Sequence, residues 1–145
     1  MRLLKCLPFL LSLCCAYAEE GAKEDVERHR ALAEQGDVEA QLILANSYIQ
    51  GEGVPQDYAE AMKWIRMAAE QGHASAQFNL GSCYASCRGV PEDDVTAYMW
   101  LNLASAQGDE DSKLRRDLVT KRMTREQIAE GQKMSREWLE KRENK

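Results

Sequence analysis

The residues of this chain best suited to chemistry are two cysteines and two histidines. Cys83 and Cys87 lie four residues apart, and His29 and His73 are the only histidines. A thiolate beside an imidazole base is a nucleophile, and cysteine with histidine also ligates zinc. However, no neighbouring residue orients either histidine as a base, and a zinc site built from Cys83, Cys87 and His73 lacks a fourth ligand. We therefore expect no catalytic residues, no metal and no cofactor.

The cysteine pair has a second possible role. In an oxidising compartment Cys83 and Cys87 could form a disulfide. Residues four apart in a regular helix have suitable Cα distances but poorly directed side chains, whereas a helix end can bend to suit. Two free thiols are the alternative, and the spacing does not decide between them. The sequence also lacks Gly-x-Ser-x-Gly, Ser-x-x-Lys and a glycine-rich phosphate loop, the usual signals of serine hydrolases and nucleotide-binding enzymes.

A repeat of 36 residues organises the elements that must position any site. Residues 37–72 and 73–108 align without a gap, and 13 of the 36 positions are identical. A fixed period of this size is typical of stacked repeat proteins, which usually bind partners over a long surface. The identical pairs are Ala40/Ala76, Gln41/Gln77, Leu44/Leu80, Tyr48/Tyr84, Gly53/Gly89, Val54/Val90, Pro55/Pro91, Asp57/Asp93, Ala61/Ala97, Trp64/Trp100, Ala68/Ala104, Gln71/Gln107 and Gly72/Gly108.

Each repeat predicts two helices. Apolar residues recur at spacing four from Ala40 to Tyr48, which marks the first helix. Asp57 begins the second helix, and Glu60 three residues later is typical of a capping box. Small residues let helices approach closely, so we expect a core built on the repeated alanines, which are Ala40, Ala61, Ala68, Ala76, Ala97 and Ala104.

Degenerate helices flank the two repeats. Residues 22–35 predict a lone capping helix, and residues 109–142 predict two more. The last of these starts at Thr124, with Gln127 completing a capping box. The sequence therefore predicts an all-α chain of about seven helices.

The N-terminal residues have the pattern of a secretory signal peptide. Arg2 and Lys5 precede an apolar run, and Ala16-Tyr17-Ala18 places small residues where a signal peptidase reads. The alternative is a membrane anchor, but the run is shorter than the roughly 20 residues that span a bilayer. We expect cleavage after Ala18, a folded domain over residues 19–145, no stable membrane insertion afterwards, and a periplasmic or secreted protein.

The charge balance argues against a nucleic-acid partner. The chain has a net charge of −5, and removal of Arg2 and Lys5 with the signal leaves 17 basic against 24 acidic residues. An acidic chain of net charge −7 repels phosphate backbones. We therefore expect no nucleic acid among the partners.

The repeated motifs resemble the Sel-one-like repeat family. They are Ala-x-x-x-Leu-Ala/Gly-x-x-Tyr, Gly-Val-Pro-x-Asp, Ala-x-x-Trp and Ala-x-x-Gln-Gly, and they cover residues 37–108. The resemblance implies a tetratricopeptide-like α-solenoid of antiparallel helix hairpins with an adaptor role. One departure is Cys87, which stands where the family expects the helix-ending glycine that is Gly51 in the first repeat. A left-handed conformation costs a non-glycine residue about 1–2 kcal/mol, so this helix should end differently or be compensated.

In tetratricopeptide-like stacks the first helix of each pair lines the concave face, which predicts a groove for a peptide or protein. Leu42, Phe78 and Leu114 recur every 36 residues as an apolar row, unless they pack between the hairpins instead. Asn46 and Ser82 lie beside the row with side chains that can meet a peptide backbone. The predicted groove residues are Glu39, Leu42, Asn46, Ile49, Ser75, Phe78, Ser82 and Leu114.

We expect a non-catalytic, exported interaction module whose partner is another protein or peptide. One alternative is an enzyme acting on cell-wall or β-lactam compounds, as suggested for cysteine-rich relatives. Another is a secreted effector directed at a host, which would use the same groove. The sequence does not separate a secreted effector from a periplasmic adaptor.

Overall fold

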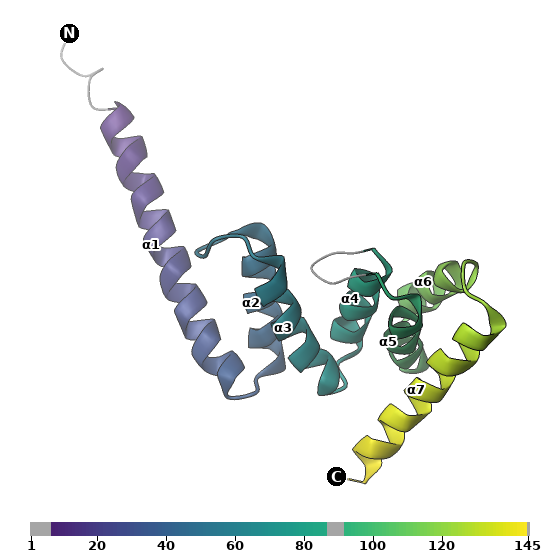
Figure 1. The fold of residues 1–145 in the computed structure, drawn as a ribbon. Helices are drawn as coiled ribbons and strands as arrows, with labels where there is room; N and C mark the ends of the chain where they lie inside the picture. The colour runs from purple at the N-terminus through teal and green to yellow at the C-terminus, as the bar shows by residue number, and fades with distance from the viewer. Residues whose placement is uncertain (1–6, 87–91, 145) are drawn as a thin grey trace.

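The computed structural model consists of α-helices joined by short turns (Figure 1). It describes the backbone of residues 7–86 and 92–144, and side chains from residue 20 onward. No strand occurs in these residues, and none of their helices is long and apolar enough to cross a membrane. The prediction of an all-α chain with about seven helices is confirmed. The helices are α1 (Leu7–Glu34), α2 (Val38–Gln50), α3 (Tyr58–Glu70), α4 (Ala74–Ala85), α5 (Asp94–Ala106), α6 (Glu110–Thr120) and α7 (Arg125–Glu143).

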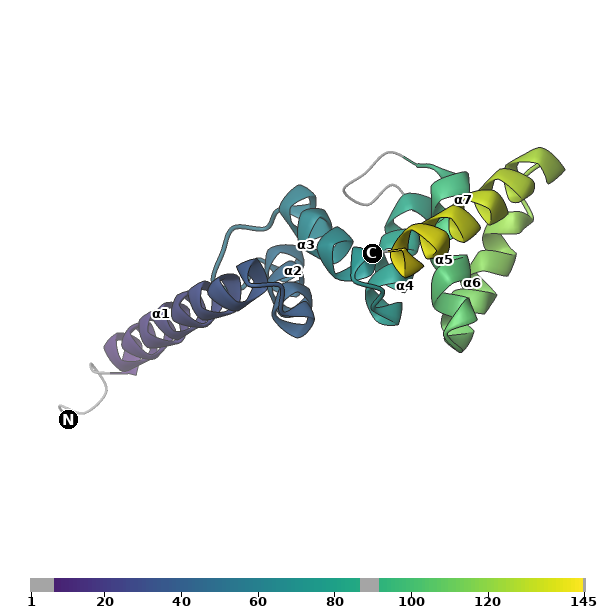
Figure 2. The ribbon, with the colours of Figure 1, turned by 90° about the horizontal axis from the view of Figure 1, so that it is seen from below.

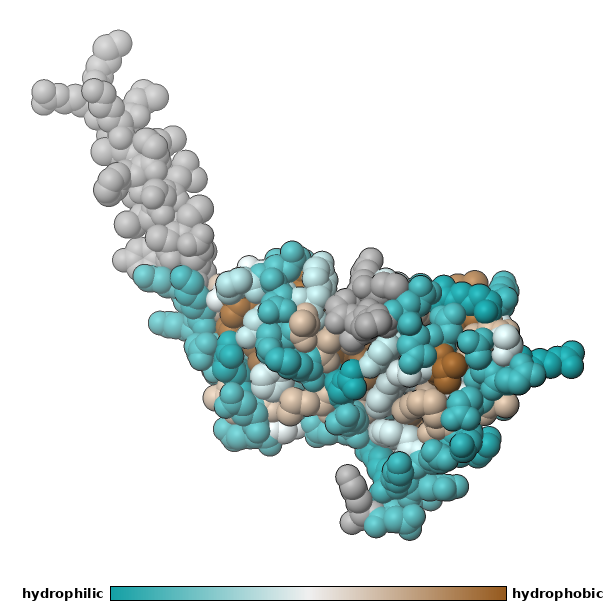
Figure 3. Space-filling model, viewed as in Figure 1, coloured by the Kyte–Doolittle hydropathy of each residue, from teal (hydrophilic) through white to brown (hydrophobic). Residues whose placement is uncertain are grey.

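The helices stack as hairpins along one direction. Each helix from α1 to α5 packs against the next one in the sequence, which is the arrangement of a solenoid. The helix predicted over residues 22–35 is the C-terminal part of α1, which begins at Leu7. Cleavage after Ala18 would fall inside that helix and remains a prediction. Figure 3 shows that the surface on one side of the stack is mostly hydrophilic, with hydrophobic residues at several places along the stack of helices.

Short polar side chains start the helices as predicted, with one exception. Asp37 accepts a hydrogen bond from Ala40 N, and Thr124 and Gln127 form the predicted capping box. Asp57 does cap α3, accepting from the backbone N–H groups of Ala59 and Glu60, but the capping box predicted for it with Glu60 is wrong. The Asp57 N–H donates to the carbonyl of Tyr48 at 2.9 Å and is not available to Glu60, whose carboxylate pairs with a lysine one turn on.

The first helices of the two repeats end differently. Gly51 ends α2 in the left-handed conformation, with φ of 75°. In the second repeat α4 stops at Ala85, and its cap Ser86 has φ of −133°, which lies outside the left-handed region. The chain therefore leaves the helix before it reaches Cys87, which lies outside the described residues. This agrees with the steric cost of a non-glycine residue at a left-handed position.

A core of alanines and larger apolar residues runs through the hairpins. All six repeated alanines are buried, as predicted from their spacing. Leu44 and Leu80, which occupy the same position in the two repeats, are fully buried between them. Small residues at the contacts let the helix backbones approach, and the leucines fill the space that remains.

A buried glutamine joins each hairpin to the unit before it. The amide nitrogen of Gln41 donates to the carbonyl of Ala33 in α1 at 3.0 Å. The amide oxygen of Gln41 accepts a hydrogen bond from Gln71 Nε2, also at 3.0 Å. Gln41 is fully buried. The side chain therefore ties the end of α1 to both helices of the first repeat, and both polar ends of its amide are satisfied.

The same arrangement recurs 36 residues later. Gln77 donates to the carbonyl of Ala69 at 3.3 Å and accepts from Gln107 Nε2 at 2.8 Å. A pairing of arginine with tyrosine repeats at the same period. Arg30 donates to the Tyr48 hydroxyl at 3.0 Å, and the pair that follows it by 36 residues is Arg66 and Tyr84, at 2.5 Å.

The last helix folds back along the stack (Figures 1 and 2). α7 packs chiefly against α5, where Trp138 meets Trp100 edge to face with ring centroids 5.9 Å apart. Near its C-terminus, Arg142 donates to the carbonyl of Gln71 at 2.5 Å. Gly131 is buried against Tyr98, which lets the two helices approach closely.

We predict that Gln77→Leu lowers the free energy of unfolding by about 2 kcal/mol, because the Ala69 carbonyl and the Gln107 amide would lose a buried partner. Urea unfolding followed by circular dichroism measures the change. Gln50→Leu is the matched control, since Gln50 is exposed at the end of α2. Equal unfolding midpoints for the two variants would contradict the structural role assigned to the buried glutamine.

We also predict that Gly131→Ala destabilises the protein by about 1–2 kcal/mol, although alanine favours a helix over glycine by about 1 kcal/mol. A Cβ at this position would lie 2.6 Å from Tyr98 Cδ1. Thermal unfolding compares it with Gly21→Ala in α1, where a Cβ meets nothing within 4 Å. The control should be neutral or stabilising, and a gain in stability from Gly131→Ala would refute the close packing of α7.

Candidate functional site

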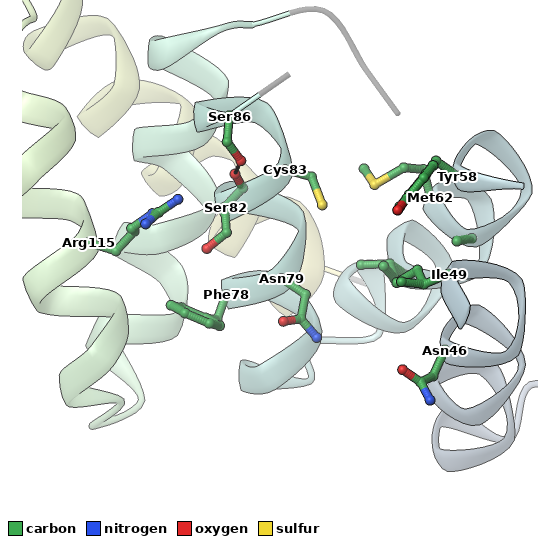
Figure 4. A pocket seen from close by; sticks show the side chains of 12 residues that line it. Asn46, Ile49, Tyr58, Met62, Phe78, Asn79, Ser82, Cys83, Ser86 and Arg115 are labelled. Carbon is green, nitrogen blue, oxygen red and sulfur yellow. Dashed lines mark hydrogen bonds between the residues drawn. The ribbon is translucent and has the colours of Figure 1, made fainter. Parts of the chain in front are cut away.

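A cavity of about 510 Å³ lies on the side of the stack where first helices of consecutive hairpins face each other. α2 and α3 form one wall, α4 forms the other, and α6 contributes one residue beyond α4 (Figure 4). We call this cavity the groove. Its lining residues are Asn46, Ile49, Tyr58, Ala61, Met62, Ile65, Phe78, Asn79, Ser82, Cys83, Ser86 and Arg115.

The structure brings four of the eight predicted groove residues together. Asn46 and Ile49 come from α2, while Phe78 and Ser82 come from α4. The other four lie outside the cavity lining. Glu39 and Ser75 are exposed near the starts of α2 and α4. Leu42 is half-buried, and Leu114 on α6 is 63% exposed.

Two members of the predicted apolar row, Leu42 and Phe78, divide differently between core packing and the groove. Leu42 packs against the larger core cluster, which agrees with the alternative that it lies between hairpins. Phe78 packs against a second cluster formed by Ala97, Leu101 and Val119, yet it also lines the groove. Phe78 on α4 therefore contacts both the second core cluster and the cavity.

Sequence reasoning missed the contribution of the second helix. Tyr58, Met62 and Ile65 on α3 line the groove, although only first helices were expected there. Their spacing of four and three residues places them on one helical face, and this was the available signal. Arg115 was also missed, although it lies 36 residues after Asn79, another lining residue.

Several polar side chains of the groove make no hydrogen bond within the described residues. The Ser82 Oγ is buried without a hydrogen-bond partner, whereas Ser86 Oγ donates to the Ser82 carbonyl at 2.6 Å. Asn46 and Asn79 are exposed on opposite walls. Among the described residues of the lining, Arg115 is the only charged one. The groove therefore combines an apolar floor with amide, hydroxyl and guanidinium groups.

The residues first considered for chemistry do not come together. Cys83 lines the groove, while Cys87 lies outside the described residues, so the predicted disulfide stays untested. His73 Nε2 lies 3.5 Å from a Glu39 carboxylate oxygen, and its side chain makes no cap hydrogen bond to α4. His29 contacts a backbone carbonyl within α1. In the described part of the chain, no three His, Cys, Asp or Glu residues are grouped to hold a metal ion.

Comparison with known proteins agrees with this arrangement. The profile of the Sel1 repeat matches residues 38–73 and 74–109, one residue later than the repeats defined above. A solved protective antigen of uropathogenic Escherichia coli strains, which displays an SLR fold, is 35% identical, with a TM-score of 0.78 over 85% of this chain. A Sel1 repeat protein from Oxalobacter formigenes is 33% identical, with a TM-score of 0.64 over 67% of this chain.

The chain spans only part of these relatives, covering 26% of the antigen and 40% of the Oxalobacter protein. No curated protein matches it. Sel1 repeats are generally protein-interaction modules and typically non-catalytic scaffolds. With two matched repeats and two solved relatives of the same fold, the chain belongs to the Sel1 repeat family.

Proposed function

We propose that this protein is an exported, non-catalytic interaction module that binds a segment of a partner protein in the groove. The observation that carries the proposal is the position of the groove between consecutive hairpins, where Asn46 and Phe78 lie on successive first helices. A volume of about 510 Å³ falls within the range of ligand sites in proteins, and side-chain amides on both walls suit a peptide backbone.

The composition of the groove favours a polypeptide over a reacting substrate. Ile49, Tyr58 and Phe78 keep part of their apolar surface accessible in the groove, and covering that surface gains free energy. Met62 and Ile65, already buried, form the apolar floor beneath them. Acid–base or nucleophilic catalysis needs a base within hydrogen-bond reach of its target. The described residues that line the cavity include no histidine, aspartate or glutamate to act as such a base.

Export rests on the N-terminal sequence pattern alone. The periplasm and the extracellular medium are both open as destinations, and a secreted effector would use the same groove. Fractionation of the native cell, with the protein followed in the envelope and in the medium, distinguishes them. No specific observation favours an enzyme acting on cell-wall or β-lactam compounds.

Photo-crosslinking in the native cell tests the proposed site. We expect crosslinkers at Phe78 and at Asn46 to capture the same partner, because the two side chains line one cavity. A crosslinker at Lys63, an exposed residue of α3 outside the lining, is the matched control. Capture from Lys63 alone, or no specific capture from either groove position in both the envelope and the medium, would refute the groove as the binding site.

We predict that Ser82→Ala changes the free energy of unfolding by less than about 0.5 kcal/mol, because the Ser82 hydroxyl gives up no intramolecular hydrogen bond. Ser135→Ala is the contrast. Its buried hydroxyl donates to the Gly131 carbonyl at 3.0 Å, and its loss should cost about 1 kcal/mol. Urea unfolding gives both values. If Ser82 serves the partner, Ser82→Ala alone should reduce crosslinking from Phe78, and a large loss of stability in that variant would show that the hydroxyl is structural.

A further inference from the structure

Arg115 places one positive charge in the groove, and the described lining residues supply no negative one. Its guanidinium lines the cavity from α6, and Figure 4 shows the side chain directed toward Ser82. None of the twelve lining residues is acidic, although the chain as a whole carries a net charge of −5. The sign of the groove is therefore opposite to that of the protein around it.

Arg115 also differs from the arginines near it. Arg116 bonds to Asn102 and Asp117, and Arg122 bonds to Asp94. Within the described part of the chain, Arg115 has no hydrogen bond and no carboxylate within 4.0 Å. A half-buried guanidinium presents a planar fork that matches a carboxylate. The Arg115 guanidinium is therefore available to bind a carboxylate of another molecule.

The apolar surface continues past Arg115 along α6. Leu114 and Leu118 lie 36 residues after Phe78 and Ser82, so they occupy the groove-side positions of the next first helix. They are 63% and 56% exposed, because α7 packs chiefly against α5. A bound chain that ended at Arg115 would leave both leucines uncovered. A chain that continues past Arg115 would cover them.

We propose that the groove binds a protein segment with an internal acidic side chain, Asp or Glu, flanked on both sides by apolar residues. The carboxylate pairs with Arg115. Apolar residues on one side rest on the floor beside Phe78, and those on the other side rest on Leu114 and Leu118. This proposal rests on the proposed function and specifies the partner's chemistry at the same site.

The test uses arrays of ten-residue peptides with apolar residues on both sides of one fixed central residue, which is Glu, Gln or Lys. Attachment through the C-terminus removes the terminal carboxylate. A second array of the Gln pool, attached through the N-terminus, presents a free terminal carboxylate instead. Binding of the labelled purified protein is measured on all pools at low and high salt, since screening weakens an exposed ion pair.

We expect the Glu pool to retain at least fivefold more protein than the Gln pool, with the Lys pool lowest and the difference reduced by salt. Arg115→Ala should reduce the difference to less than twofold, and Arg115→Glu should shift the preference to the Lys pool. Arg136→Ala is the matched control, because Arg136 is exposed on α7 outside the groove. Circular dichroism verifies that each variant keeps its helices.

Two results would overturn the proposal while leaving the proposed function intact. One is equal retention on the Glu and Gln pools together with partner capture from Phe78 and Asn46 in cells. The other is retention on the free-carboxylate Gln array as strong as on the Glu pool, which would identify a chain terminus as the source of the charge. If no pool retains the protein, the acidic-segment proposal is wrong, and only failed capture in cells would also remove the proposed function.

Discussion

The structure depends on the need to satisfy a polar side chain buried between hairpins. Gln41 and Gln77 sit at the same position of the two repeats, and each is enclosed by apolar packing. Alanine contacts alone would allow one hairpin to slide along the next, because apolar surfaces have no direction. A buried amide left without partners costs about 1–3 kcal/mol, so only the register that brings it to the preceding carbonyl is acceptable. The glutamines therefore fix how each hairpin sits on the one before it.

The groove follows from that register. Fixing the hairpins sets α2 and α4 at one relative position across the cavity, with α3, which packs against both, lining it between them. The pairing of Arg30 with Tyr48, repeated by Arg66 with Tyr84, holds the same junctions at a second point. Between the glutamine and the tyrosine of each first helix, the buried leucine (Leu44 or Leu80) is the same in both repeats, whereas the other positions differ. Asn79 and Arg115, one period apart, give the two ends of the groove different chemistry on the same scaffold.

The period, the helix number and the buried alanines could be predicted because each depends on local spacing. Asp57 caps α3 as predicted, but its capping box with Glu60 failed because the Asp57 N–H was already bonded to Tyr48, a contact nine residues away that no local pattern contains. Half of the predicted groove residues reached the cavity because alignment by 36 identifies equivalent positions on first helices. It gives no information on the second helix behind them, so Tyr58 and Met62 were missed.

The path of α7 was the hardest feature to predict, and it matters for the site. The sequence predicts two degenerate helices over residues 109–142, and its local spacing does not say which neighbour the last one packs against. Gly131 and Trp138 dock α7 on α5, where two tryptophans meet. The packing of α7 on α5 stabilises the end of the stack with a large aromatic contact and leaves Leu114 and Leu118 exposed on α6. The same packing thus closes one side of the stack and leaves apolar side chains of α6 exposed beside Arg115.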